Sequence, residues 1–179
     1  QKFKSVITGD SSLSKRPMKR ISDPLNKMNA KITTTNGSLP LKINGNNLIA
    51  RNINLEIPSA QIKSGLLLAS LNTSGETTIT ENKITRDHTE IMLESFGANI
   101  ETNNVNNKKI IKIDGGKELI PKNINVPNDL SSSTFFIVSA LINKNSNIRL
   151  KNINNNPTRN GIIQALKKMG AKIKISSEH

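Results

Sequence analysis

Apolar and polar residues alternate along this chain with two different periods. A period of two residues predicts half-buried strands, and it recurs at 3–8, 30–33, 39–43, 53–57, 77–80, 98–101 and 110–113. Spacings of three and four residues predict helices at 18–28, 60–71, 85–96 and 130–141. Because strands and helices are interleaved, the order of elements predicts an α/β fold.

One predicted helix has an unusual distribution of polar residues. From Gly65 to Leu71 it is apolar almost all round, so we expect it to be buried. Its first turn is polar, and the residues there are Ser59, Gln61, Lys63 and Ser64. Since the first N–H groups of a helix have no partner inside the helix, this polar start predicts an anion site. The segment 126–141 repeats the theme of strand, proline, hydroxyl residues and buried helix.

A longer repeat accompanies these elements. Thr85-Arg86 followed by Phe96-Gly97-Ala98 recurs as Thr158-Arg159 followed by Met169-Gly170-Ala171, with the same offset (159 − 86 and 170 − 97, both 73). Arg16 before Met28-Asn29-Ala30 is a third, truncated copy. We interpret each copy as a small strand-helix-strand-helix-strand unit, with equivalent strands at 30–32, 98–100 and 171–173. The coil at Gly115-Gly116 predicts a domain boundary, and neither it nor Gly9-Asp10 has the spacing of a P-loop.

Composition limits the possible chemistry. The 179 residues suffice for one domain or two small ones, and they begin with Gln1 in a strand-like segment, so we expect a piece of a longer protein. The absence of cysteine excludes disulfides and thiolate chemistry, and the two distant histidines argue against zinc. No apolar run is long enough for a membrane span, and no signal peptide is apparent. We therefore expect a cytoplasmic protein.

The net charge of +13 first suggests a polyanionic partner. However, the basic residues are scattered and aromatic residues make up only 2% of the chain, so nucleic acid and membrane are disfavoured against small anionic metabolites. Arginine is the more informative cation, because its planar fork binds phosphate or carboxylate through two hydrogen bonds. Three of the six arginines fall at equivalent points of the repeat. We expect one cationic cavity lined by Ser59, Gln61, Arg86 and Arg16.

Each candidate also has a purely structural interpretation. Ser59 suits a helix N-cap, and Arg86 could form a solvent-exposed ion pair with Asp87. His88 suits an exposed first-turn residue, and nothing supports a catalytic triad of Ser59, His88 and Asp87. From the residues alone, the prediction is an anion-binding, repeat-built α/β protein.

Several motifs together resemble the 5-enolpyruvylshikimate-3-phosphate synthase family, the 3-phosphoshikimate 1-carboxyvinyltransferases, in its bacterial class II-like form. They lie at 9–18, 58–64, 85–90, 129–132 and 156–159, and they span nearly the whole chain. The resemblance implies a two-domain enzyme whose domains each assemble three βαβαββ units. Residues 1–118 would be the later part of one domain, and residues 119–179 the first unit of the other.

The resemblance also implies a reaction and roles for residues. The enolpyruvyl group of phosphoenolpyruvate would pass to the 5-hydroxyl of shikimate 3-phosphate, with release of phosphate and no metal or cofactor, in the shikimate pathway to chorismate and aromatic amino acids. Ser59, Ala60, Gln61 and Arg86 would hold shikimate 3-phosphate, with Gln61 also reaching phosphoenolpyruvate, and Arg16 would bind phosphoenolpyruvate. The family's proton-transfer motifs have no counterpart here, so we name no catalytic acid or base and expect this chain alone to be inactive.

Two details and several alternatives complete the prediction. Asn29 and Asn128 stand where relatives commonly have glycine, which asparagine can replace because it tolerates the left-handed conformation. We expect the full-length enzyme to be a monomer. The alternatives are a UDP-N-acetylglucosamine enolpyruvyl transferase, an RNA 3′-terminal phosphate cyclase and, in another class, a non-enzymatic basic module that binds nucleic acid.

Overall fold

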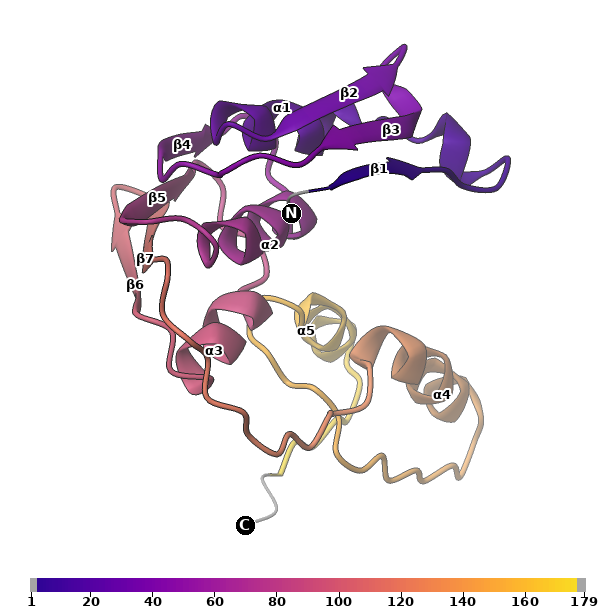
Figure 1. The fold of residues 1–179 in the computed structure, drawn as a ribbon. Coiled ribbons are helices and arrows are strands. Elements are labelled where there is room, and N and C mark those ends of the chain that lie inside the picture. Colours follow the sequence, from indigo (N-terminus) through magenta and orange to yellow (C-terminus); the bar gives the residue numbers. More distant parts are fainter. Residues whose placement is uncertain (1–2, 177–179) are drawn as a thin grey trace. The chain divides into compact units, whose positions relative to one another are not determined.

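A computed structural model describes residues 3–176 (Figure 1). The chain forms two compact units, which divide between Lys122 and Asn123. The first unit contains β1 (Lys4–Ile7), the 3₁₀ helix η1 (Leu13–Lys15), α1 (Lys19–Lys27), β2 (Lys31–Thr35), β3 (Ser38–Asn44), β4 (Asn52–Leu55), α2 (Ala60–Ser70), β5 (Glu76–Glu81), α3 (His88–Ser95), β6 (Ile100–Val105) and β7 (Lys108–Asp114). The second contains α4 (Leu130–Ile142) and α5 (Gly161–Lys168). That these units belong to two enolpyruvyl transferase domains, divided near 118, stays a prediction.

Two sheets build the first unit. One has the order β1-β3-β2 and is antiparallel throughout, and α1 packs against β2. The other has the order β4-β5-β7-β6, in which only β4 and β5 are parallel. The parallel pair needs a crossover, which α2 provides, whereas β6 and β7 form a hairpin. All seven strands coincide with strands expected from the alternation of apolar residues.

The core lies between the second sheet and helices α2 and α3. Alternate residues of β4, β5 and β7 point inward and meet Leu66 and Leu67 of α2, which are both fully buried, and Leu93 of α3. Helix α1 packs against α2 at Gly65, where an added Cβ would lie 3.0 Å from Cδ1 of Ile21. The expectation that α2 is a buried helix is therefore confirmed for the face that carries Leu66 and Leu67, whereas Leu68 is 53% exposed.

Topology brings the N-termini of two helices to one edge of this sheet. Helix α2 follows β4 and helix α3 follows β5, and these two strands are parallel. Their carboxyl ends therefore meet at the same edge, which in open α/β sheets is the edge where ligands bind. The opposite end of α2 is closed by Gly115-Gly116, since the N–H of Gly116 donates to the carbonyl of Leu71 over 3.0 Å. These glycines terminate a helix rather than form a phosphate-binding loop.

The sequence repeat corresponds to one helix-ending turn used three times. In each copy a residue with positive φ follows the helix, and the N–H of the next alanine donates back to a leucine carbonyl five residues earlier, as in a Schellman motif. The three bonds run from Ala30 to Leu25 (3.1 Å), from Ala98 to Leu93 (2.9 Å) and from Ala171 to Leu166 (3.0 Å). The left-handed residues are Asn29 (φ 69°), Gly97 (φ 80°) and Gly170 (φ 92°).

One of the two asparagines that were expected to be left-handed has that conformation. Asn29 is left-handed, so that part of the expectation is confirmed. Asn128 does not have a positive φ, and the expectation was wrong there. Its side-chain amide instead donates to the carbonyl of Lys151 over 3.0 Å, and its backbone forms a parallel bridge with Ile153.

The second unit differs from its sequence prediction in two ways. The segment before Pro127 and residues 171–173 form no strand. The strands equivalent to 171–173, β2 and β6, each pair with the next strand in the sequence, and no described strand follows Ala171. Because no sheet lies beneath it in the described part of the chain, α4 is not the buried helix that its sequence predicts. Phe135 is 79% exposed and Ile142 is 76% exposed.

The first turn of α4 is nonetheless well capped. Asp129 accepts from the backbone N–H of Ser132 over 3.0 Å, and this bond holds the pKa of the Asp129 carboxyl below its ordinary value. Side-chain donation by Ser132 and the charge of Arg159, whose Nη2 lies 3.5 Å from Oδ1, act in the same direction. The carboxylate form is therefore the one that stabilises this helix start.

The left-handed turn of the repeat can be tested with two glycines that have open space around them. Gly170→Ala forces a Cβ into the φ 92° conformation and should lower the free energy of unfolding by about 1–2 kcal/mol. Gly161→Ala is the matched control: Gly161 lies in α5, where an added Cβ would have no neighbouring atom within 4 Å, and alanine there should stabilise by up to about 1 kcal/mol. Chemical denaturation measures both values, and equal effects would contradict the assignment.

Candidate functional site

The candidate site is a cavity of about 470 Å³ at the N-terminus of α2. Ser59 caps this helix, and its Oγ accepts from the N–H of Ile62 over 3.4 Å. The N–H groups of Ala60 and Gln61 come before that bond, so the helix itself supplies them with no acceptor. The residues that line the cavity are Ala60, Gln61, Ser64, Gly65, Leu68, Arg86, His88 and Thr89.

The structure brings together three of the five residues expected to bind substrate. Ala60, Gln61 and Arg86 line the same cavity, although Arg86 is 25 residues or more from the other two in sequence (86 − 61). Ser59 adjoins it as the cap of α2, but its side chain is not part of the lining. Arg16 directly follows η1 and does not line this cavity either, so its role stays a prediction.

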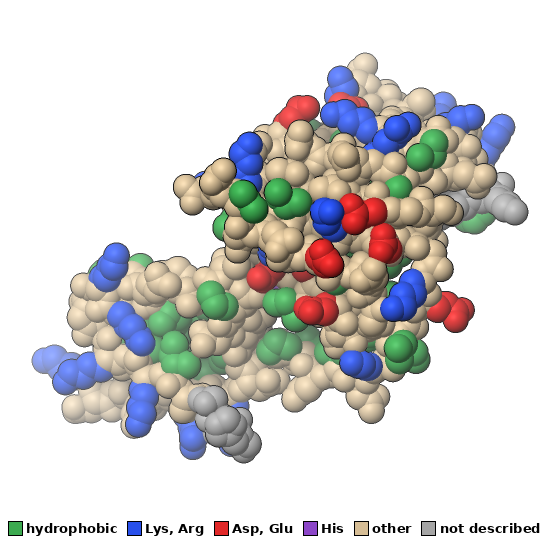
Figure 2. Space-filling view, turned by 90° about the vertical axis from the view of Figure 1, so that its left-hand side faces the viewer, with side chains coloured by type: hydrophobic (Ala, Val, Ile, Leu, Met, Phe, Trp, Pro, Cys, Tyr) green, Lys and Arg blue, Asp and Glu red, His purple; other side chains and the backbone are tan. Residues whose placement is uncertain are grey.

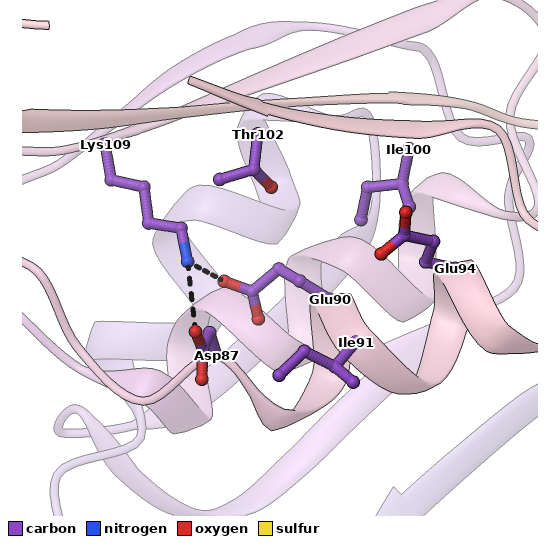
Figure 3. A pocket seen from close by; sticks show the side chains of 7 residues that line it. All are labelled: Asp87, Glu90, Ile91, Glu94, Ile100, Thr102 and Lys109. Carbon is purple, nitrogen blue, oxygen red and sulfur yellow. Dashed lines mark ion pairs between the residues drawn. The ribbon is translucent and has the colours of Figure 1, made fainter. Parts of the chain in front are cut away.

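A second cavity, of about 280 Å³, lies on the other side of the start of α3 (Figure 3). Three carboxylates line it, those of Asp87, Glu90 and Glu94, together with the single cation of Lys109. The larger cavity has no acidic residue in its lining and contains the guanidinium of Arg86. Because like charges repel strongly where water is scarce, an anion would be excluded from the smaller cavity and attracted to the larger one.

A buried ionic network extends from the wall of the smaller cavity into the core. The ammonium group of Lys63 is fully buried and lies 2.9 Å from Oε2 of Glu81 and 2.7 Å from Oε1 of Glu90. Lys109 Nζ continues the network, 3.3 Å from Oε1 of Glu90 and 3.9 Å from Oδ2 of Asp87. Figure 3 shows Lys109 reaching between these two carboxylates. Glu90 is held by charge, because neither of its oxygens has a hydrogen-bond partner among the described residues.

Strand alternation explains how charged residues came to be buried here. Glu81 continues the inward positions of β5 after Thr77 and Ile79, and Lys109 precedes the inward positions Ile111 and Ile113 of β7. These two charged residues are also direct cross-strand partners. They therefore sit on the core face at the edge where the apolar core ends.

This network has no counterpart among the sequence predictions, and Lys63 does not lie where its position in the helix predicts. Lys63 was expected among the polar groups around the start of α2, yet it is fully buried, because it shares the inward stripe of Leu66, Leu67 and Ser70. The burial of Glu81 could have been predicted from the sequence, because the alternation of inward positions in β5 continues from Ile79 to Glu81. The alternative of a solvent-exposed Arg86–Asp87 pair is not observed, since Asp87 faces Lys109 across the smaller cavity.

The repeat places an arginine beside a helix start in the second unit as well. Arg159, the counterpart of Arg86, donates from Nη2 to Oγ of Ser131 in the first turn of α4. It also lies 3.5 Å from the carboxylate of Asp129, so its charge is already partly neutralised. The lining of the larger cavity contains no such carboxylate beside Arg86.

Three other kinds of site are relevant for the residues that the structure describes: a basic patch, a metal centre and a membrane span. Lys and Arg side chains are dispersed over the face shown in Figure 2 and do not form one continuous patch. Among residues 3–176, no group of three His, Cys, Asp or Glu side chains is placed to hold a metal ion. No helix in that range is long and apolar enough to cross a membrane.

Comparison with known proteins gives a consistent picture. The family model described as EPSP synthase (3-phosphoshikimate 1-carboxyvinyltransferase) matches residues 1–179. Relatives with the name 3-phosphoshikimate 1-carboxyvinyltransferase include those of Vesicomyosocius okutanii, 48% identical, and Ruthia magnifica, 50% identical, each over 99% of this chain. The structure of EPSP synthase from Acinetobacter baumannii superimposes with a TM-score of 0.86 at 47% identity over the whole chain. The chain spans only 40% of each of these proteins.

The network should dominate the stability of the first unit. Lys63→Met leaves Glu81 and Glu90 buried without their shared cation and should lower the free energy of unfolding by about 3–5 kcal/mol. Lys112→Met is the control, because Lys112 pairs with Glu76 on the surface and such pairs contribute about 0–1 kcal/mol. Urea denaturation followed by circular dichroism measures both, and a similar small loss in the two variants would contradict the assignment.

Proposed function

The chain belongs to the EPSP synthase family, and from this premise we propose that it forms part of a 3-phosphoshikimate 1-carboxyvinyltransferase. The proposed reaction transfers the enolpyruvyl group of phosphoenolpyruvate to the 5-hydroxyl of shikimate 3-phosphate and releases phosphate. The observation that carries the proposal is the convergence of Gln61, Arg86 and the first turn of α2 on one cavity without carboxylates.

The proposed ligand of this cavity is shikimate 3-phosphate. The guanidinium of Arg86 can hold two oxygens of an anionic group at once, and the N–H groups of Ala60 and Gln61 are directed out of the helix start. The side-chain amide of Gln61 can donate to one ligand and accept from a hydroxyl of another, which suits a residue that meets both substrates. Ser59 supports the site chiefly by capping α2.

Two anionic substrates repel each other, and fixed positive groups offset that repulsion. When both substrates are bound with the 5-hydroxyl of shikimate 3-phosphate near the enol carbon of phosphoenolpyruvate, the bimolecular step becomes effectively unimolecular. Such positioning can supply about 7 kcal/mol or more of the barrier reduction. We propose Arg16 as a further contact, to phosphoenolpyruvate. This chain supplies no group to which we assign proton transfer, so we expect binding from it and no turnover.

The other proposed functions have less support. A UDP-N-acetylglucosamine enolpyruvyl transferase or an RNA 3′-terminal phosphate cyclase would share the general architecture, but the named relatives are 3-phosphoshikimate 1-carboxyvinyltransferases. The dispersed basic side chains do not favour a nucleic-acid-binding module. We further propose that the enzyme acts as a monomer in the cytoplasm, in the shikimate pathway to chorismate.

Arg86 provides the direct test in the protein that carries this chain. Arg86→Lys keeps the charge but loses the bidentate fork, so affinity for shikimate 3-phosphate should fall about 10- to 100-fold. Arg51→Lys is the matched control, because Arg51 is exposed and does not line the cavity, and its affinity should stay at the wild-type value. Isothermal titration calorimetry measures both. Unchanged affinity in Arg86→Lys, or tighter binding of UDP-N-acetylglucosamine than of shikimate 3-phosphate, would refute the proposal.

A further inference from the structure

The buried ionic network contacts the chain on both sides of Arg86. On one side, Oγ1 of Thr85 donates to Oε1 of Glu81. On the other side, the carboxylate of Asp87 lies 3.9 Å from Nζ of Lys109. Arg86 itself faces the larger cavity, whereas Asp87 lines the smaller one. The neighbours of the arginine are therefore fixed from beneath while its own side chain is left for a ligand.

The segment that carries Arg86 needs such support. Residues 82–86, between β5 and α3, belong to no helix or strand, whereas the carbonyl of Asp87 accepts from the N–H of Ile91 over 3.1 Å at the start of α3. The side chain of Asp87, the residue before α3, forms no cap hydrogen bond with that helix. Two side-chain tethers, Thr85 to Glu81 and Asp87 to Lys109, therefore hold this segment.

The network also connects the tethers to the rest of the site. Lys63 of α2 joins Glu81 to Glu90, and Glu90 joins Lys63 to Lys109. A continuous series of paired side chains thus runs from Thr85 through α2 and α3 to Asp87. In addition, the hydroxyls of Ser64 and Thr89 lie 2.6 Å apart, which links α2 directly to α3 at the cavity wall.

We propose that Thr85 and Lys109 are positioning residues that hold Arg86 in its ligand-binding orientation. Neither residue touches the ligand in this proposal. Thr85 acts by anchoring the backbone to the buried Glu81, and Lys109 acts by anchoring Asp87. The inference rests on the proposed function, since it assumes that Arg86 binds an anion, and it adds residues outside the cavity lining to the determinants of affinity.

A double-mutant cycle in the protein that carries this chain tests the proposal. The variants are Thr85→Val, which keeps the shape but removes the hydroxyl, Arg86→Lys, and both together. Calorimetric titration with shikimate 3-phosphate should show affinity about tenfold lower in Thr85→Val than in wild type. In the Arg86→Lys background, Thr85→Val should have little further effect, because the fork that Thr85 orients is already gone.

Companion variants separate positioning from general damage. Thr85→Ser keeps the hydroxyl and should keep wild-type affinity. Lys109→Met should repeat the behaviour of Thr85→Val in the same cycle, whereas Lys112→Met on the same strand should not change affinity. Thermal unfolding checks that each variant is folded at the assay temperature, and Lys109→Met carries the test if Thr85→Val is not.

The outcomes distinguish this proposal from the function on which it rests. Affinity within twofold of wild type in both Thr85→Val and Lys109→Met overturns it. The proposal is also overturned if Thr85→Val lowers affinity equally in the wild type and in Arg86→Lys. Thr85 would then act independently of the Arg86 guanidinium. If Arg86→Lys alone has no effect, the proposed function fails. If Arg86→Lys weakens binding and the tether variants do not, only the positioning role fails.

Discussion

The site depends on the need to pair charges inside a low-dielectric interior. Lys63 is fully buried, and an uncompensated ammonium group there would be strongly destabilising. Two carboxylates from different elements, Glu81 of β5 and Glu90 of α3, satisfy it. Because each partner comes from a separate element, the arrangement of α2, α3 and the sheet is fixed at the edge where the apolar core ends. The larger cavity is lined by residues of α2 and α3, so the same ion pairs fix the position of its walls.

Negative and positive charge are separated on the two sides of the start of α3. The carboxylates of Asp87 and Glu90 line the 280 Å³ cavity, and Arg86 lines the 470 Å³ cavity. Adjacent residues in sequence, Arg86 and Asp87, thus contribute opposite charges to opposite cavities. This separation keeps the acidic groups of the network out of the lining of the larger cavity. The second unit lacks the separation, since Arg159 lies close to Asp129.

The sequence was sufficient to predict the elements and the repeat because both leave local patterns. Alternation predicted every strand of the first unit, and the recurrence of Met-Asn-Ala, Phe-Gly-Ala and Met-Gly-Ala corresponds to one helix-ending turn. The polar start of α2 and Arg86 were predicted to meet, and they line one cavity. Their proposed roles in binding await experiment.

The errors arose where the outcome depends on distant partners. The burial of Lys63 depends on Glu81 and Glu90, which lie 18 and 27 residues away, and no local pattern reports such a pairing. The apolar sequence of α4 predicted burial, but burial also requires a surface to pack against, and no sheet lies beneath α4 among the described residues. The region 171–173 has strand-like residues without a described partner strand.

A chemical-shift map of the isotopically labelled protein during titration with shikimate 3-phosphate measures directly whether the start of α2 and Arg86 form one anion site. We predict that the backbone amide signals of Ala60 and Gln61 and the Nε–H signal of Arg86 move together and saturate at one ligand concentration. Signals of Glu94 and Thr102, which line the smaller cavity, should stay in place. Shifts confined to the smaller cavity, or an Arg86 signal that does not respond while Ala60 does, would contradict a single site built from these two elements.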